Sequence, residues 1–191
     1  MRHTLVLLLM LFATLVAQNL SLAAESPSDA PSLVANPELR DVDASGAPRG
    51  WRLDGTAVEV APDPTVTRDG LNSLRVTFEK GAPYAGIVQQ LEGDRVRGRT
   101  VVVDGWLARD TANAPVGVWA RAFDKEGGSI GYANSYELDL PADKRFRRHS
   151  IELKVPPETN TLLVGASIYG DSGMAWFGGV DASIKRDSDT Q

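Results

Sequence analysis

Short runs of alternating apolar and polar residues, separated by turn-forming residues, extend from Asn36 to about Ile184. Clusters of Gly, Pro, Asp and Asn lie between the runs, and no stretch places apolar residues at helical spacing. The runs that we predict to be strands lie near residues 51–55, 57–61, 73–79, 85–92, 99–109, 115–124, 130–140, 148–156, 161–170 and 174–184. Evenly spaced strands with turn residues between them predict an all-β chain folded as an antiparallel β-sandwich.

The period-2 alternation also predicts which side chains point away from the core. In "VVVDGWLARD" the valines share one side, which turns Trp106 outward. In "PVGVWARAFD" the small apolar residues share one side, and Trp119 and Arg121 lie on the other. In "IGYANSYEL" Asn134 and Tyr136 belong to one mixed face. Because a buried guanidinium needs a partner, an arginine beside aromatic rings is a poor core residue, and we expect these faces to meet solvent or a ligand.

The first 24 residues have the pattern of a secretory signal peptide. Arg2 and His3 precede the apolar run "LVLLLMLFATLVA", and small residues end the segment at Ala24. A membrane-spanning helix needs about 20 apolar residues, and Gln18 and Asn19 interrupt this run too early. We therefore expect a cleaved signal peptide and a secreted or periplasmic protein; an uncleaved anchor is the alternative.

The rest of the chain divides into three parts by composition. Residues 25–35 are rich in Ser, Pro and Ala and are predicted to form a flexible lead-in. Residues 36–186 are predicted to form the β-sandwich domain, and residues 187–191 a polar tail. This length suits one domain with a sizeable core, so the absence of cysteine is compatible with an oxidising compartment.

Composition argues against nucleic-acid binding and against catalysis. The 20 basic and 25 acidic residues give a net charge of −5, whereas nucleic-acid affinity depends on a basic face. His149 is the one histidine after the signal segment, and it has no obvious nucleophile or orienting acid near it in sequence. No nucleophile elbow, zinc-ligand spacing or phosphate-binding loop is present. We predict no catalytic residues, although a pair of distant carboxylates for glycoside hydrolysis stays open.

Six motifs occur in an order that resembles a known family. They are "NPELRDVDASGAPRGW" (36–51), "DGLNSLRVTF" (69–78), "GIVQQL" (86–91), "RGRTVVVDGWLAR" (97–109), "FRRHSIELKVP" (146–156) and "GASIYGDSGMAWFGGV" (165–180). Together they resemble the jelly-roll domains of the galactose-binding-like superfamily, in particular the CenC-type carbohydrate-binding modules. The resemblance implies a non-catalytic module; many such modules bind polysaccharide, and others bind proteins or pack against neighbouring domains. Shared architecture does not by itself carry function.

The last strand departs from the family pattern at its metal site. In the family this strand often reads Trp-x-Asp-Asp-Val, and one of its acids helps to hold a structural calcium with a Glu near the amino-terminal Asn. Here Gly178 and Gly179 replace the acids, and Arg40 stands where the Glu would be. Calcium takes six to eight oxygens, so we predict no metal and no cofactor, and expect the glycines to form a bulge or allow close backbone approach. The alternative is a regrouped site from Asp41, Asp43 and Asp181.

Binding faces for sugars use flat aromatic rings against the apolar faces of pyranoses, while amide and guanidinium groups bind the hydroxyls. The predicted carbohydrate-binding residues are Trp106, Trp119, Arg121, Asn134, Tyr136 and Gln89. In this hypothesis the two tryptophans form one platform, the polar residues contact hydroxyls, and the tyrosine lies at an edge. Gln89 corresponds to the glutamine of the family's strand motif. Large aromatic residues of a sandwich more often pack inside, as we expect of Trp51 and Trp176.

The run "DKRFRRH" (143–149) concentrates basic residues in an acidic protein. Contact with anionic polysaccharide or lipid headgroups is one interpretation. We favour a solvated strand edge, whose charges discourage pairing with another sheet.

The sequence thus predicts an exported, non-catalytic carbohydrate-binding module that does not insert into a membrane after signal cleavage. Its expected partner is a polysaccharide or glycan. The alternative is an envelope protein-interaction or structural module of the same fold, with a protein partner and no sugar site. The replaced calcium acids favour this alternative.

Overall fold

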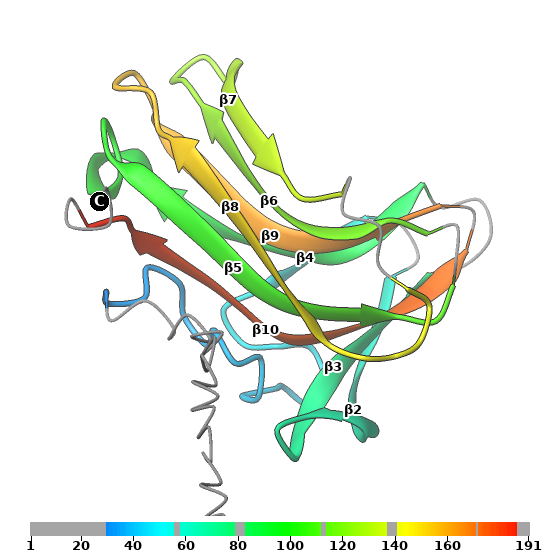
Figure 1. The fold of residues 1–191 in the computed structure, drawn as a ribbon. Helices are drawn as coiled ribbons and strands as arrows, with labels where there is room; N and C mark the ends of the chain where they lie inside the picture. Colours follow the sequence, from blue (N-terminus) through cyan, green and yellow to red (C-terminus); the bar gives the residue numbers. More distant parts are fainter. Residues whose placement is uncertain are drawn as a thin grey trace, which may run out of the picture.

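The computed structural model describes residues 30–55, 58–78, 83–111, 114–136, 141–170 and 172–186, which form two five-stranded antiparallel sheets (Figure 1). The strand order is β1-β4-β9-β6-β7 in the first sheet and β2-β3-β10-β5-β8 in the second. The strands are β1 (Arg52–Gly55), β2 (Val58–Arg68), β3 (Leu71–Phe78), β4 (Tyr84–Glu92), β5 (Thr100–Arg109), β6 (Val116–Phe123), β7 (Ser129–Asn134), β8 (Arg147–Lys154), β9 (Thr161–Tyr169) and β10 (Gly173–Ile184). A short 3₁₀ turn, η1 (Gly93–Arg95), follows β4. Each predicted run overlaps one strand, and the all-β antiparallel sandwich is confirmed.

The inner faces of the two sheets share one apolar core. Alternate residues of β6 and β5 point into it, as the sequence pattern predicts, and all are at most 1% exposed: Val116, Val118, Ala120, Ala122, Val101, Val103 and Leu107. Burying a valine or leucine side chain contributes about 1.5–3 kcal/mol. These inward residues therefore hold the two layers together and leave the alternate residues for the outer faces.

Two strands of the second sheet lie at its edges, β2 and β8. Pro62 and Pro64 lie within β2, where their missing N–H donors are tolerated because an edge strand has one unpaired side. The sequence pattern placed a break at these prolines, but the strand continues to Arg68. The basic run 143–149 leads into β8, so its predicted position at a sheet edge is confirmed.

The segment before Asn36 packs against the second sheet. Leu33 N–H donates to the carbonyl of Ala182 at 2.7 Å, and Ser32 Oγ lies 2.6 Å from Asp181 Oδ1. Val34 is 6% exposed. Composition alone predicted that residues 32–35 belong to a flexible lead-in. They are instead part of the packed domain, because their apolar and polar groups contact the second sheet.

The last strand, β10, contains a β-bulge at its two adjacent glycines. The register to β5 shifts between Phe177 and Val180, around Gly178 and Gly179. Gly179 has a φ of +142°, a region that side chains rarely adopt. Val180 N–H donates to the carbonyl of Pro37 at 2.8 Å, so the bulge also receives the amino-terminal segment. The predicted glycine bulge is confirmed.

Two tryptophans are buried, as expected. Trp51 is 7% exposed and donates its indole N–H to the carbonyl of Asn36 at 3.1 Å. Trp176 is 2% exposed and donates to Asp63 Oδ2 at 2.8 Å. Both indoles therefore pack and satisfy their polar atom at the same time.

The predicted signal peptide (1–24) and tail (187–191) lie outside the described residues, and both stay predictions. Across the described ranges, no helix combines the length and the apolar character that a membrane crossing requires.

Candidate functional site

The outer face of the first sheet carries all four tyrosines of the chain, Tyr84, Tyr132, Tyr136 and Tyr169. We call this surface the tyrosine face. It belongs to the layer of β4, β6, β7 and β9 and points away from the layer of β5, β8 and β10 (Figure 1). Its other members are Arg52, Asp54, Trp119, Arg121, Asn134 and Ser167.

Three tyrosine rings pack on one another at the centre of this face. Tyr84 in β4 lies directly opposite Tyr169 in β9, and their rings stack with centroids 5.4 Å apart. Tyr136, just after β7, meets Tyr169 edge-on at 4.7 Å. Aromatic pairs of this kind contribute about 0.5–1.5 kcal/mol beyond the area they bury. The rings thus fix one another's orientation and form a preorganised aromatic surface.

Trp119 lies flat on the sheet beside these rings. It is paired with Gly165 in β9, where a Cβ atom would stand 3.0 Å from Cζ2 of the indole. Its Nε1 donates to Ser167 Oγ at 2.9 Å, and the residue is 8% exposed. Trp119 is outward-facing as predicted, but its ring is too buried to serve as an open platform. It supports the face from beneath.

The β7 margin of the tyrosine face is polar and exposed. The guanidinium of Arg121 lies 4.8 Å from the ring centroid of Tyr132, its cross-strand neighbour. Tyr132 is 44% exposed, and both Arg121 and Asn134 are exposed. Asn134 Oδ1 accepts from the backbone N–H of Tyr136 at 3.0 Å, which ties the margin to the central rings. This margin offers guanidinium and amide donors beside an accessible ring.

The β1 margin carries an acid. Asp54 lies on β1 opposite Gly86 of β4 and is half-buried. Burial raises the pKa of Asp54, while the charge of Arg52 and a hydrogen bond with Tyr84 oppose the rise. Burial and the nearby Asp54 charge in turn raise the pKa of Tyr84. The phenol therefore stays protonated at neutral pH. The β1 margin thus combines the Asp54 carboxylate with the Arg52 guanidinium, and the β7 margin carries the Arg121 guanidinium.

Two further tyrosines of the face, Tyr132 and Tyr136, are neutral as well. Burial, followed by the proximity of Tyr169, raises the pKa of Tyr136 far above its ordinary value. Burial also raises the pKa of Tyr132. The face therefore presents neutral phenols, which suits an uncharged ligand rich in hydroxyl groups.

The structure divides the predicted site between two sheets. Trp119, Arg121, Asn134 and Tyr136 come together on the tyrosine face. Trp106 lies on β5, on the outer face of the second sheet, where it is 38% exposed. The expected joint platform of Trp106 and Trp119 is wrong, because the core separates the two indoles. Alternation predicts that a side chain points outward, but it does not say from which sheet.

Gln89 is the second correction. It shares the inward side of β4 with Ile87 and Leu91, and both ends of its amide are occupied. Oε1 accepts from Ala35 N–H at 2.7 Å, and Nε2 donates to the Ala35 carbonyl at 3.2 Å. Gln89 therefore fastens the amino-terminal segment and is not available to a ligand on the tyrosine face.

Sequence reasoning missed six of the ten named members of the face: Arg52, Asp54, Tyr84, Tyr132, Ser167 and Tyr169. For Tyr169 a signal existed, since it alternates with the core residues of β9 and shares the outward side with Ser167. The pairing of β4 with β9, which stacks Tyr84 on Tyr169, joins segments far apart in the chain. No local pattern predicts it, and the same holds for Asp54 on β1.

His149 is completely buried, on the side of β8 that faces the other sheet. Its Nδ1 lies 2.9 Å from Ser135 Oγ, which accepts from the backbone N–H of Val118 at 3.0 Å. Burial lowers the pKa of His149 to about 4, so the imidazole is neutral at physiological pH. These contacts fit the structural role that the sequence favoured for this residue.

The acids near the amino-terminal segment have other partners. Asp41 pairs with Arg49 at 3.1 Å, and Arg40 pairs with Glu38 at 3.0 Å. Asp181 Oδ1 accepts from Ala182 N–H at 2.7 Å as well as from Ser32. Within the described part of the chain, no three His, Asp or Glu residues lie close enough to share a metal ion.

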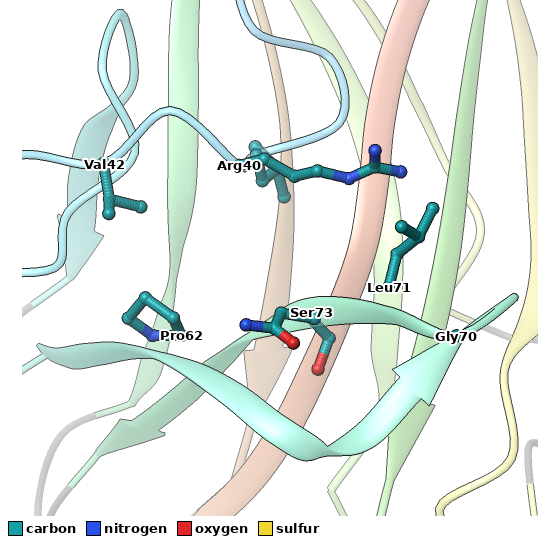
Figure 2. Close-up of a pocket in the computed structure, with 8 residues that line it drawn as sticks. Arg40, Val42, Pro62, Gly70, Leu71 and Ser73 are labelled. Atoms are coloured by element: carbon teal, nitrogen blue, oxygen red, sulfur yellow. The ribbon is translucent and has the colours of Figure 1, made fainter.

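A pocket of about 260 Å³ lies between the amino-terminal segment and the β2–β3 hairpin. Figure 2 shows Arg40 extending toward Leu71 on one side, with Val42 and Pro62 on the other. Leu71 is 38% exposed. The lining contains no aromatic residue, and its cation is already paired, so the pocket has neither a ring surface nor a free charge to bind a sugar.

Comparisons with known proteins identify the fold. No family model matches the sequence, and no curated protein sequence matches it. The CBM22-1 xylan-binding domain of Paenibacillus barcinonensis Xyn10C is similar in structure, with a TM-score of 0.60 and 14% identity over 81% of this chain and 95% of that domain. TmCBM61, solved in complex with β-1,4-galactotriose, gives a TM-score of 0.55 and 14% identity over 82% of this chain and 100% of that one.

A larger protein contains a similar domain. The enzymatically active domain of tailspike protein 4 of bacteriophage CBA120 gives a TM-score of 0.61 and 17% identity over 81% of this chain, which spans 21% of the tailspike chain. At these identities the comparisons show a shared fold, the β-sandwich of carbohydrate-binding modules. The CenC type in particular stays a prediction.

Proposed function

We propose that this chain is an exported, non-catalytic carbohydrate-binding module that binds an uncharged glycan on the tyrosine face. The observation that carries this proposal is the packed set of Tyr84, Tyr169 and Tyr136, bordered by Asp54 at one margin and by Arg121 at the other. Rings of this kind present apolar surface to the hydrogen-bearing faces of pyranoses. The bordering acceptors and donors suit hydroxyl groups, which need a partner when they leave water.

Preorganisation supports the same function. The central rings already contact one another, and Trp119 beside them is held by Ser167. A ligand therefore does not have to order these side chains, and less of the interaction free energy is lost on binding. The exposed pair of Arg121 and Tyr132 extends the surface toward β7, which gives length for a chain of more than one sugar.

The similar structures support a glycan as ligand and a non-catalytic role. A xylan-binding domain and a module solved with a galactotriose are matched over nearly their whole length. The buried, neutral His149 offers no general base on the tyrosine face. Export rests on the predicted signal peptide, and a ligand outside the cytoplasm is consistent with it.

Calorimetric titration of the purified chain with β-1,4-galactan and xylan oligosaccharides tests the proposal. We expect binding to at least one of these neutral glycans, and a loss of at least about tenfold in affinity for Tyr132→Ala and Tyr169→Ala. Leu71→Ala is the control, because it removes an exposed apolar side chain from the opposite sheet, outside the tyrosine face, and should leave the affinity unchanged. Thermal unfolding of each variant separates lost contacts from lost folding.

Two results would contradict the proposal. The first is that the protein binds none of a broad panel of neutral glycans, and the second is that the control variant loses as much affinity as the tyrosine variants do. Recovery of one stoichiometric protein partner without any glycan binding would instead favour the envelope-interaction alternative.

A further inference from the structure

The outer face of the second sheet contains a hollow of about 340 Å³, on the opposite side of the sandwich from the tyrosine face. We call it the Trp106 hollow. It is lined by Thr67, Arg68, Asp69, Trp106, Lys144, Arg145 and Phe146. The lining thus comes from the end of β2, the middle of β5 and the segment that leads into β8.

Trp106 is the most accessible of the four tryptophans. It is 38% exposed, whereas Trp51, Trp119 and Trp176 are at most 8% exposed. The guanidinium of Arg68 lies 5.6 Å from the centroid of its ring. Leaving so large an apolar ring in contact with water is unfavourable, and an exposed indole in a hollow is typical of a binding surface.

The charge of the hollow is opposite to that of the protein. Its lining has three basic side chains and one acidic side chain, in a chain of net charge −5. Arg145 is exposed and forms no ion pair with a described residue. Lys144 lies 3.8 Å from Asp110, and Arg68 Nε lies 3.4 Å from the largely exposed Asp69. The hollow therefore keeps a local excess of positive charge.

The neighbouring arginines of the basic run do not contribute in the same way. Arg147 donates two hydrogen bonds of 2.8 Å to Asp143, and Arg148 pairs with Asp104 at 3.1 Å. Their charges are compensated within the chain. Among the arginines of the basic run, Arg145 is the one for which no ion pair with a described residue is present, and it lines the hollow. Arg147 and Arg148 therefore fit the edge-strand role, and Arg145 is available for a different one.

The hollow is held in shape before any ligand arrives. Lys144 has a φ of +59°, and its N–H donates to the carbonyl of Arg109 at 3.0 Å. Arg145 N–H donates to Asp143 Oδ1 at 3.0 Å. Phe146 packs toward the β10 bulge, where a Cβ on Gly178 would stand 3.0 Å from its ring. These contacts fix the segment that carries two of the three cations.

We propose that the Trp106 hollow is a second binding site, selective for a carboxylate-bearing sugar such as a uronic acid residue of an acidic polysaccharide. The sugar packs against the exposed part of the Trp106 ring, over which Arg68 also lies, and its carboxylate is bound by Arg145 with Arg68 beside it. A guanidinium binds a carboxylate through charge-assisted hydrogen bonds, and a ring beside it adds apolar contact. A neutral sugar has no carboxylate and cannot form these charge-assisted hydrogen bonds.

Calorimetric titration of the full chain with oligogalacturonate tests this site. We expect wild-type binding that weakens at least about tenfold in Trp106→Ala and in Arg145→Gln. Binding should also weaken at about 1 M NaCl, where the Debye length is about 3 Å. Lys125→Gln is the matched control, because it removes one positive charge from an 81% exposed side chain outside the hollow and should leave the affinity unchanged. Arg145 is exposed, so its variant reports on binding even if Trp106→Ala impairs folding.

The proposal is overturned if oligogalacturonate does not bind, or if both hollow variants bind as the wild type does. It is also overturned if the protein binds vesicles containing phosphatidylglycerol through Arg145 but ignores oligogalacturonate, which would indicate an anionic lipid surface. Tyr132→Ala should leave oligogalacturonate binding intact while it weakens neutral-glycan binding. The two proposals are therefore tested independently: this one, which concerns a site beyond the proposed function, by oligogalacturonate binding, and the proposed function by neutral-glycan binding.

Discussion

The side chain of Arg68 occupies the space over Gly179. A Cβ atom on Gly179 would stand 3.2 Å from Arg68 Nη1 and equally close to the carbonyl oxygen of Pro37. A Cβ on Gly178 would stand 3.2 Å from Cβ and Cδ of the same arginine. The two adjacent glycines of β10 thus make room for a guanidinium, at a bulge that also receives the amino-terminal segment.

Gly179→Ala should destabilise the protein by about 3 kcal/mol, because a φ of +142° is unfavourable for alanine and its methyl group meets backbone and guanidinium atoms. Urea unfolding measures this loss. Gly127→Ala is the control: its φ is +83°, but no atom lies within 4 Å of the added Cβ. It should cost about 1 kcal/mol. Equal losses in the two variants would show that the close approach of Arg68 has no effect.

Gln89→Met should free the amino-terminal segment. The change removes the two hydrogen bonds to Ala35 while it keeps the length of the side chain, and we expect a loss of about 2 kcal/mol in the free energy of unfolding. Amide exchange at Ala35, measured by NMR, should accelerate. The neighbouring Gln90→Met, on the exposed side of β4, should change neither quantity. Unchanged exchange at Ala35 in Gln89→Met would contradict the fastening role.

The carboxylate of Asp63 connects the middle of β2 to Trp176. It is 5% exposed and accepts from Thr65 N–H at 2.7 Å and from the Trp176 indole at 2.8 Å. Burial acts to raise the pKa of Asp63, but the hydrogen bonds from Thr65, Trp176 and Val66 outweigh it and lower the pKa well below its usual range.

Asp63→Asn should therefore cost about 2–3 kcal/mol, since an amide nitrogen placed against the indole N–H leaves a buried donor unpaired. Because the folded pKa of Asp63 is depressed, its stabilisation is present above the unfolded pKa of about 4 and is lost as pH falls below it. The difference between wild type and variant in urea unfolding should accordingly shrink below about pH 4. A difference that does not depend on pH would show that the charge of Asp63 is unimportant.

The strands could be predicted because each is encoded locally. The valines of β5 and the alternating Val and Ala of β6 specify their inner faces without reference to partners. The bulge at Gly178 and Gly179 could also be predicted locally, because glycine within a strand pattern often marks a bulge or a close backbone approach.

The site could be predicted only in part, because it depends on which strands become neighbours. Trp119, Arg121 and Asn134 meet because β6 pairs with β7 over a short turn. Tyr84 and Tyr169 meet because β4 pairs with β9 across a long stretch of chain, and Trp106 is separated from them because β5 enters the other sheet. The alternation of residues within a strand predicts neither of these pairings. The motif match placed Gln89 in the site, although the amide of Gln89 forms hydrogen bonds with Ala35.

The buried His149 should make folding stability depend on pH between about 4 and 6.5. Its pKa is about 4 in the folded protein, because burial disfavours the charged imidazolium, and about 6.5 in an unfolded chain. Between these values the unfolded chain binds the extra proton, so stability is full above the unfolded pKa and falls as pH decreases. From pH 7 to pH 5 the expected loss in the free energy of unfolding is about 2 kcal/mol.

His149→Gln, which does not titrate, should lack this loss although it is less stable at pH 7. Urea unfolding of both proteins at the two pH values measures the difference, and parallel losses would show that His149 becomes protonated in the folded state.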